Sequence, residues 1–380
     1  MKITLKQALI HLSLFLVTFV TTTLAGAEWT YSKSVFMPDF TFDDFLSGMS
    51  YSVPFLLILT IHEFGHYFTA IHHKVRTTLP YYIPLPPPLM LGTLGALIRL
   101  GKVQSKMQHF DIGIAGPLAG FLVAIGVLVF GFTHLPPPEY IFQIHPEYQQ
   151  YGLDYAKYVY QPEYLAEHAG ADILIGKNLI FMFVEKFASD PAGIPNVHEL
   201  MHYPYLFAGL LALVITSINL LPIGQLDGGH ILYGLLGFRG HKVLASVVFM
   251  SFVFYAGLGV LTPESSSNSL IIGIPLLVGF YFICFTGMQM HWQNTLMYAV
   301  AVFTGQFVLS TIFPGTQGYP NWFFFAFVIG RFVGVLHPPS EIEQPLDTPR
   351  VILGWIALAI FVITFAPKPL EIVVTAATAQ

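Results

Sequence analysis

The chain has 380 residues, of which 54% are hydrophobic and only 10% are charged. Ordinary soluble domains carry about 25% charged residues, so this composition excludes a water-soluble globular enzyme and favours a multi-pass membrane protein. A net charge of -5 argues against a nucleic-acid partner, and a single cysteine, Cys284, excludes a disulfide scaffold or a Cys-based zinc site.

Apolar segments long enough to cross a bilayer, which takes about 20 residues, recur along the whole chain. In chain order they are residues 8–25, 46–73, 110–134, 205–238, 243–262, 269–287, 294–313, 321–336 and 351–367. The fourth is interrupted at Pro222 and the eighth is short, so we expect an all-α polytopic membrane protein with about eight or nine spanning helices. The first segment has features of a signal peptide, but a retained helix is the simpler interpretation.

The distribution of positive charge predicts the orientation of the chain. Basic residues are concentrated between the second and third segments, at Lys74, Arg76, Arg99, Lys102 and Lys106. In the segment 135–204 acidic residues outnumber basic ones. We therefore expect residues 74–109 to face the cytoplasm and 135–204 to be extracytoplasmic. No soluble domain is evident, and we predict a single integral membrane domain over residues 1–380.

A motif with a defined chemistry lies inside the second segment: His62-Glu63-Phe64-Gly65-His66, an H-E-x-x-H sequence. Residues four apart share one face of a helix, so His62 and His66 can offer two imidazoles to one Zn²⁺, with Glu63 as general base toward a zinc-activated water. Chance matches occur, but each ionisable group at the centre of a membrane helix costs about 2.5–3.5 kcal/mol, and bound zinc offsets that cost. The location therefore favours a zinc site.

Catalytic zinc needs a third protein ligand and an open position. Asp227 is the best candidate, because an apolar helix stops at Pro222 and Asp227-Gly228-Gly229 is expected to form a turn before a second short helix. The turn alone could explain these residues, and His230 is an alternative ligand. Asn219 is polar within an apolar helix, which is also compatible with a helix–helix hydrogen bond.

These motifs together resemble the site-2 protease family of intramembrane zinc metalloproteases. The resemblance is carried by His62-Glu63-x-x-His66, Gly92-Thr93-x-Gly95-Ala96, Gly116-Pro117-Leu118-Ala119-Gly120 and Asn219-x-x-Pro222-x-x-x-Leu226-Asp227-Gly228-Gly229. It covers residues 46–240, the expected catalytic core, followed by C-terminal transmembrane helices at 241–380. Further on, His337-Pro338-Pro339, Pro345-Leu346-Asp347 and Leu353-Gly354-Trp355 resemble the branch found in bacteria and plastids. Neither a PDZ domain nor a cystathionine-synthase-type domain is evident.

The resemblance implies that His62, His66 and Asp227 bind one zinc ion per chain. It also implies that Glu63 is the catalytic base and that Asn219 lies near the substrate backbone. A small re-entrant β element near the active site is implied as well. The proline-rich residues 80–88 and the stretch 95–103 are compatible with it, and such an element could hold a substrate extended.

These features predict a metalloendopeptidase that cleaves transmembrane segments of membrane-tethered regulatory proteins or remnant signal peptides. Its partners are then a transmembrane substrate and the lipid bilayer, in a bacterial inner membrane with the active site toward the cytoplasm. The oligomeric state is left open. A non-proteolytic metal carrier is the alternative, although a carrier would distribute its ligands over several spans. An inactive scaffold is a third interpretation, against which the intact Glu63 argues.

Other residues are expected to have structural roles. Gly116 and Gly120 form a small-x-x-x-small face that should pack behind the catalytic helix. Asp111 is expected to cap the third spanning helix, and residues 171–188 to form a helix on the membrane surface. His109, His241 and His337 are expected in loops.

Overall fold

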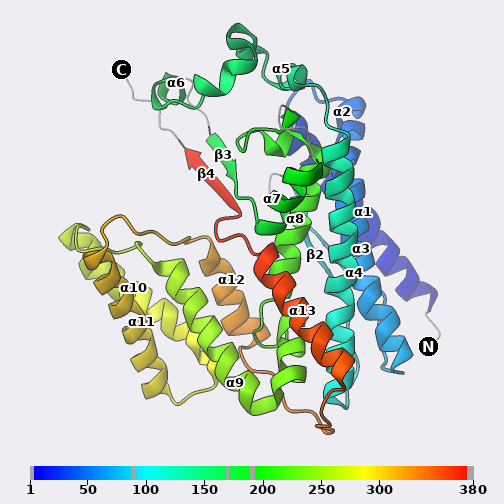
Figure 1. Ribbon diagram of the computed structural model, residues 1–380, viewed down its shortest axis with the longest axis vertical. Coiled ribbons are helices and arrows are strands. Elements are labelled where there is room, and N and C mark those ends of the chain that lie inside the picture. Colours follow the sequence, from blue (N-terminus) through cyan, green and yellow to red (C-terminus); the bar gives the residue numbers. More distant parts are fainter. Residues whose placement is uncertain (1–3, 88–90, 168–170, 189–192, 375–380) are drawn as a thin grey trace. The chain divides into compact units, whose positions relative to one another are not determined.

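The computed structural model describes residues 4–87, 91–167, 171–188 and 193–374. Most of these residues are helical, as Figure 1 shows, and the strands are few and short. Within the described ranges, six helices are long and apolar enough to cross a membrane, and three shorter apolar helices of 10–17 residues overlap other predicted segments. The prediction of an all-α polytopic membrane protein with a small β element is therefore confirmed.

The chain forms two compact units, which are described separately. Unit 1 comprises Met1–Lys102, Ala115–Ile218 and Ile360–Gln380, and unit 2 comprises Val103–Ile114 and Asn219–Ala359. One unit boundary lies between Lys102 and Val103; the others fall within α4 (Lys106–Thr133) and α13 (Thr348–Thr364) and at the last residue of α8 (Pro204–Asn219). The single membrane domain expected over residues 1–380 stays a prediction.

Unit 1 carries the helix with the H-E-x-x-H motif and all the strands of the described residues. Besides its parts of α4, α8 and α13, its elements are α1 (Leu5–Tyr31), α2 (Phe42–Ser47), α3 (Met49–His72), β1 (Tyr81–Pro84), β2 (Thr93–Leu97), η1 (Pro138–Tyr140), α5 (Ile141–Ile144), η2 (Pro146–Lys157), α6 (Pro162–Glu167), β3 (Ala171–Ile175), α7 (Leu179–Ala188), η4 (Leu200–His202) and β4 (Leu370–Val374). Unit 2 carries α9 (Asp227–Gly257), α10 (Ser267–Phe285), η5 (Thr286–Met288), α11 (Trp292–Ile312), α12 (Trp322–Val328) and η6 (Ile329–Val333).

Helices α1 and α3 pack closely because small residues meet where they contact. A β-carbon at Gly48 would lie 2.0 Å from the carbonyl oxygen of Thr23, so the site accommodates only glycine. Beside it, the hydroxyl oxygens of Thr23 and Ser52 lie 2.8 Å apart, within hydrogen-bond distance. Small and hydroxyl-bearing residues are the usual contacts between membrane helices. The helix that carries the H-E-x-x-H motif is therefore fixed against the first helix.

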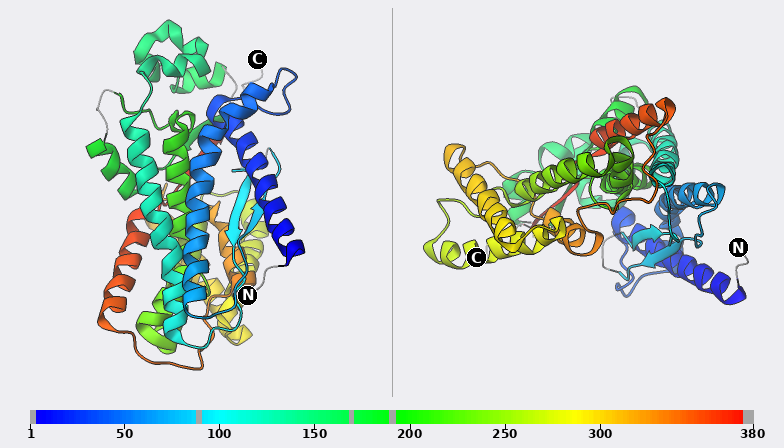
Figure 2. Two further views of the ribbon diagram at one scale, coloured as in Figure 1. Left: turned by 90° about the vertical axis from the view of Figure 1, so that its right-hand side faces the viewer. Right: turned by 90° about the horizontal axis from the view of Figure 1, so that it is seen from below.

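The small β element lies beside α1, as the left view of Figure 2 shows. Strands β1 and β2 are antiparallel, with Tyr82 opposite Ala96. The Thr21 hydroxyl of α1 donates to the Gly92 carbonyl, with an O–O distance of 2.7 Å, and anchors the start of β2. Strand β2 begins at Thr93, slightly before the predicted stretch 95–103. The prolines exclude a helix from 80–87, as expected, while residue 88 lies outside the described residues.

A buried glutamine fastens the helices of unit 2. The Gln306 side chain of α11 donates to the Phe254 carbonyl of α9, 2.8 Å away, and accepts a hydrogen bond of 2.8 Å from the Tyr281 hydroxyl of α10. Polar groups buried between membrane helices are stable when they are paired in this way. Three helices therefore share one hydrogen-bond network.

The break between α8 and α9 differs in part from expectation. Helix α8 ends at Asn219, so the predicted interruption before Pro222 is confirmed. However, residues 227–229 do not form a separate turn, because α9 begins at Asp227 and continues to Gly257 with a kink at Gly237. Glycine is required in this first turn, since a β-carbon at Gly228 would lie 2.0 Å from the Leu220 carbonyl oxygen.

Other sequence-based expectations were wrong. Residues 171–188 form strand β3 and helix α7 rather than one helix, because Ala171–Ile175 pairs with the distant β4. His109 and His241 lie in α4 and α9, not in loops. Asp111 is not a cap, since α4 already begins at Lys106.

Candidate metal centre

The two histidines of the H-E-x-x-H motif face each other on α3. Their Nε2 atoms lie 3.0 Å apart, and both side chains are buried, as is the neighbouring Glu63. The contact follows directly from helical geometry, since residues four apart lie one turn above each other. Local sequence alone therefore brings two imidazoles together in unit 1.

Glycines of α4 make room for these rings. A β-carbon at Gly116 would lie 2.2 Å from Nε2 of His66, and one at Gly120 would lie 3.3 Å from Nδ1 of His62. The predicted packing of this small-residue face behind the catalytic helix is thereby confirmed. Any side chain at Gly116 would clash with the His66 ring.

The histidine pair fits a zinc ion. Zinc binds imidazole nitrogen at about 2.0–2.1 Å, and a tetrahedral angle then separates two ligand nitrogens by about 3.3 Å. The observed 3.0 Å between the Nε2 atoms is close to this spacing. Because a β-carbon at Gly116 would clash with the His66 ring, glycine at this position lets that ring keep its place beside His62.

Asn219 and Asp227 lie at the two ends of an irregular segment in unit 2. Asn219 is the last residue of α8 and Asp227 the first of α9. The segment between them is fixed by buried Leu220 and Ile223 and by the hydrogen bond from the Gly224 amide to the Val335 carbonyl, 2.9 Å long. A carboxylate in the first turn of a helix is favoured by the helix dipole. The roles of Asn219 and Asp227 stay predictions.

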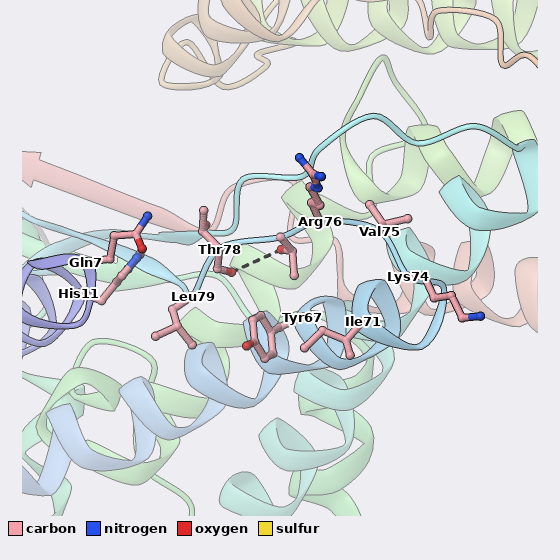
Figure 3. Close-up of a pocket in the computed structure, with 10 residues that line it drawn as sticks. Gln7, His11, Tyr67, Ile71, Lys74, Val75, Arg76, Thr78 and Leu79 are labelled. Carbon is pink, nitrogen blue, oxygen red and sulfur yellow. Dashed lines mark hydrogen bonds between the residues drawn. The ribbon is translucent and has the colours of Figure 1, made fainter. Parts of the chain in front are cut away.

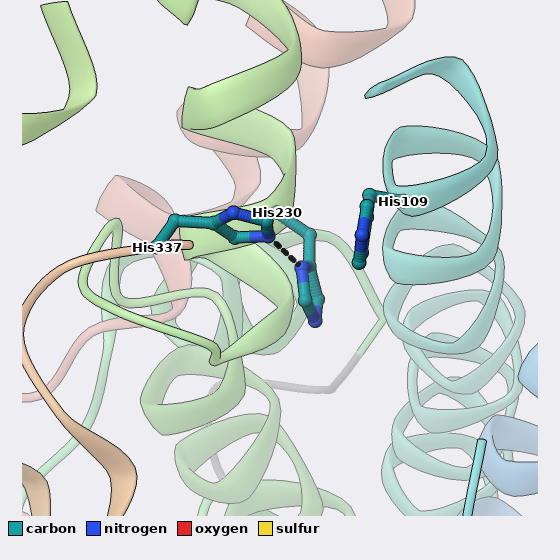
Figure 4. A group of neighbouring side chains, drawn as sticks. All are labelled: His109, His230 and His337. Carbon is teal, nitrogen blue, oxygen red and sulfur yellow. Dashed lines mark hydrogen bonds between the residues drawn. The ribbon is translucent and has the colours of Figure 1, made fainter. Parts of the chain in front are cut away.

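His230, the alternative ligand, belongs to another histidine cluster in unit 2 (Figure 4). Its Nδ1 lies 2.8 Å from Nε2 of His337, and its ring stacks on His109 with 5.2 Å between centroids. The ligand nitrogens of the three rings lie within 4.8 Å of one another. The sequence gives no spacing signal for this cluster, because its members are more than a hundred residues apart. Only the position of His337 in a family-like motif could have indicated it.

A cavity of about 580 Å³ in unit 1 is lined in part by residues that follow the motif along the chain, the first of which is Tyr67. Figure 3 shows Tyr67 and Ile71 of α3 facing Gln7 and His11 of α1 across it. Lys74 and Arg76 give the cavity basic groups.

Comparison with known proteins identifies the family of this chain. The model of Peptidase family M50 matches residues 50–263, more than half of the chain. The chain belongs to peptidase family M50, the site-2 protease family. The matched range includes all the predicted site residues, namely His62, Glu63, His66, Asn219 and Asp227. The family prediction is confirmed.

Curated relatives of this M50 chain are named as zinc metalloproteases of plants. Probable zinc metalloprotease EGY1, chloroplastic, of Arabidopsis thaliana is 28% identical over 252 residues, which cover 62% of this chain and 41% of the relative. Probable zinc metalloprotease EGY2, chloroplastic, of Oryza sativa subsp. indica is 24% identical over 250 residues, covering 60% of this chain and 40% of the relative. The chain thus spans less than half the length of these relatives. No solved structure matches it.

The family and these names support a metallopeptidase with zinc as its cofactor. The prediction of a hydrolase is thereby confirmed at the level of the family, and the metal-carrier alternative is disfavoured. The number of zinc ions per chain stays a prediction, as do the site residues. The relatives are named as chloroplastic, so they give no support to the predicted bacterial inner membrane.

Proposed function

We propose that this M50 chain is an intramembrane zinc endopeptidase that cleaves transmembrane segments of other membrane proteins. In this proposal His62, His66 and Asp227 hold one zinc ion, and Glu63 is the general base. The observation that carries it is the pair of buried imidazoles 3.0 Å apart on a membrane-length helix, with Glu63 next to His62. Metal, base and buried surroundings are the components that hydrolysis inside a membrane requires.

Each side chain at the proposed site would have a separate role in peptide hydrolysis. When bound, zinc would supply Lewis acidity toward water and the scissile carbonyl. Glu63 would take a proton from the attacking water and deliver it to the leaving amide nitrogen. His62 and His66 would fix the metal position, because the packing of α4 against α3 restricts both rings. Asn219 would hydrogen-bond the substrate backbone.

Strand β2 supports the proposal that the substrate binds in an extended form. In the described residues its sheet has the order β1–β2; both strands contact α1, and β2 also contacts α3. We propose that the edge of β2 that does not pair with β1 binds the substrate. Leu94 and Leu97 on this strand are exposed. A transmembrane helix that unwinds could add to this edge as a further strand. Main-chain hydrogen bonds would then present the scissile bond in an accessible conformation.

The membrane location is proposed from charge. The basic residues between positions 74 and 106 support a cytoplasmic location for this side of a bacterial inner membrane, with residues 135–204 on the other side. The names of the relatives make a chloroplast membrane the other candidate. Membrane-tethered regulators and remnant signal peptides are the proposed substrates. The M50 match at residues 50–263 overlaps the proposed catalytic core at residues 46–240, and the transmembrane helices at 241–380 are part of the same proposal.

The proposal is tested with Glu63→Gln in detergent-solubilised protein and a model transmembrane substrate. The variant removes the base but keeps both imidazoles, so zinc content should be unchanged while cleavage falls by about 10²–10⁴-fold. Glu264→Gln is the matched control, because Glu264 is exposed and lies outside the motif. A variant that cleaves at the wild-type rate would refute the assignment. Zinc flux into sealed vesicles that survives Glu63→Gln would favour a carrier.

A further inference from the structure

A second cluster of metal-ligand side chains lies in unit 1, in the segment between α4 and α8. His145 directly follows α5. Glu199 directly precedes η4, and His202 is the last residue of η4. Their ligand atoms converge: Nε2 of His145 lies 3.3 Å from Nε2 of His202 and 3.7 Å from Oε2 of Glu199, and the last two atoms lie 3.5 Å apart. All three belong to the predicted extracytoplasmic segment 135–204, and none is in the H-E-x-x-H region.

These distances match the spacing of ligands around one ion. Tetrahedral zinc with bonds of about 2.0–2.2 Å separates its ligand atoms by about 3.3–3.5 Å. By contrast, an N–H···O hydrogen bond has a donor–acceptor distance of about 2.7–3.2 Å. The separations of 3.5 and 3.7 Å between the rings and Glu199 are longer than this. Direct hydrogen bonds between each ring and Glu199 therefore do not explain the cluster.

The opposite side of each ring fixes the tautomer. Nδ1 of His202 lies 2.8 Å from the Thr30 carbonyl oxygen, and Nδ1 of His145 lies 3.0 Å from Oε1 of Glu147. Both oxygens are acceptors, so both Nδ1 atoms carry the hydrogen and a neutral ring has its lone pair on Nε2. This arrangement is the usual outer hydrogen bonding of histidine metal ligands.

Glu199 is oriented in the same way. The Tyr160 hydroxyl donates a hydrogen bond to its Oε1, while Oε2 faces the two rings. The side chains of Glu199 and His202 are each only 3% exposed, and that of His145 is 25% exposed. Two lone pairs and a carboxylate oxygen thus converge in a largely buried space. Such an arrangement offers three ligand atoms to one cation.

We propose that His145, Glu199 and His202 bind a Zn²⁺ ion, distinct from the ion at the H-E-x-x-H motif. Two imidazoles and one carboxylate suit zinc and leave one coordination position open. The ion fastens the segment after α5 to η4, which leads into α8, and through the bond of His202 to Thr30 it also fixes the end of α1. Zinc binding therefore stabilises this segment of unit 1.

The test is the zinc content of full-length protein purified in detergent, stripped with a chelator, reloaded with ZnCl₂ and separated from excess ion. The background carries His62→Asn, His66→Asn and His230→Asn, which removes the proposed catalytic ligands and disrupts the cluster of Figure 4. We expect this protein to retain one zinc per chain and to unfold at a higher temperature with zinc than without it. A background protein that binds no zinc overturns the proposal.

Substitutions at the individual proposed ligands test where the ion binds. Adding His202→Asn to the background should abolish zinc binding, and Glu199→Gln should weaken it by at least about 10-fold. His134→Asn, at an exposed histidine following α4, is the matched control and should bind normally. His202→Cys should restore binding, because a thiolate also binds zinc. Unchanged binding in His202→Asn contradicts the proposal; if that variant does not fold, the zinc content of the background protein decides.

Discussion

The Nε2 atoms of His62 and His66 lie 3.0 Å apart on α3, and a β-carbon at Gly116 would lie 2.2 Å from the second of them. The distance between the two histidines is therefore set by α3, and the close packing against His66 is set by α4. Because close packing and ligand position depend on the same glycine, the proposed zinc site should be sensitive to small changes on α4.

Gly116→Ala should disturb zinc binding without removing any ligand. The added methyl group would overlap the His66 ring, so the ring must rotate away from its partner, and we expect at least about a 10-fold loss of zinc affinity and of cleavage. Gly126→Ala on the same helix is the control, because its β-carbon would meet nothing within 4 Å. Competition with a chelator of known affinity measures the effect. Equal zinc affinity in both variants would show that the space at Gly116 is not part of the site.

The conformation of β2 should affect cleavage but not zinc binding. Gly95 has φ +103°, a conformation that costs other residues about 1–3 kcal/mol. We expect Gly95→Ala to distort the strand edge and lower kcat/KM for a transmembrane substrate, with zinc content unchanged. Gly152 also has a positive φ, 56°, but lies outside the β element. Gly152→Ala is therefore the control and should leave cleavage unaffected. If both variants cleave equally well, substrate pairing along β2 is not supported.

The ion pair between Asp111 and Arg350 should stabilise unit 2. The guanidinium binds both carboxylate oxygens, with distances of 2.7 Å from Nε to Oδ1 and 2.8 Å from Nη2 to Oδ2. Bidentate, partly buried pairs of this kind are the stronger ion pairs, and Asp111→Asn should lower the free energy of unfolding by about 1–3 kcal/mol. Asp347→Asn removes a more exposed contact of the same Arg350 and should cost less than about 1 kcal/mol. Chemical unfolding in detergent measures both, and equal losses would argue against the first pair as the dominant contact.

Local sequence patterns predicted the parts of the fold that depend on neighbours in the chain. The facing imidazoles of His62 and His66 follow from their spacing along one helix, and the end of α8 follows from Pro222. The Asp227-Gly228-Gly229 sequence was misjudged as a turn. Within a helix, Gly228 packs closely against the Leu220 carbonyl and Gly229 against the Gly224 carbonyl, contacts that the sequence pattern did not indicate.

Contacts between distant segments could not be predicted from the sequence. Strand β3 owes its conformation to pairing with β4, almost two hundred residues later. The cluster of His145, Glu199 and His202 likewise has no recognisable spacing, because its first member lies more than fifty residues before the others. Such groups are defined by tertiary packing rather than by periodicity.

The most direct test of the central claim is the zinc affinity of the wild type compared with Asp227→Ala. If Asp227 is the third ligand of the zinc ion held by His62 and His66, the variant should lose one equivalent of tightly bound zinc and its cleavage activity. Asp43→Ala, at an exposed aspartate of α2, should retain both. Full-affinity zinc binding by Asp227→Ala, with the wild-type stoichiometry, would contradict the account.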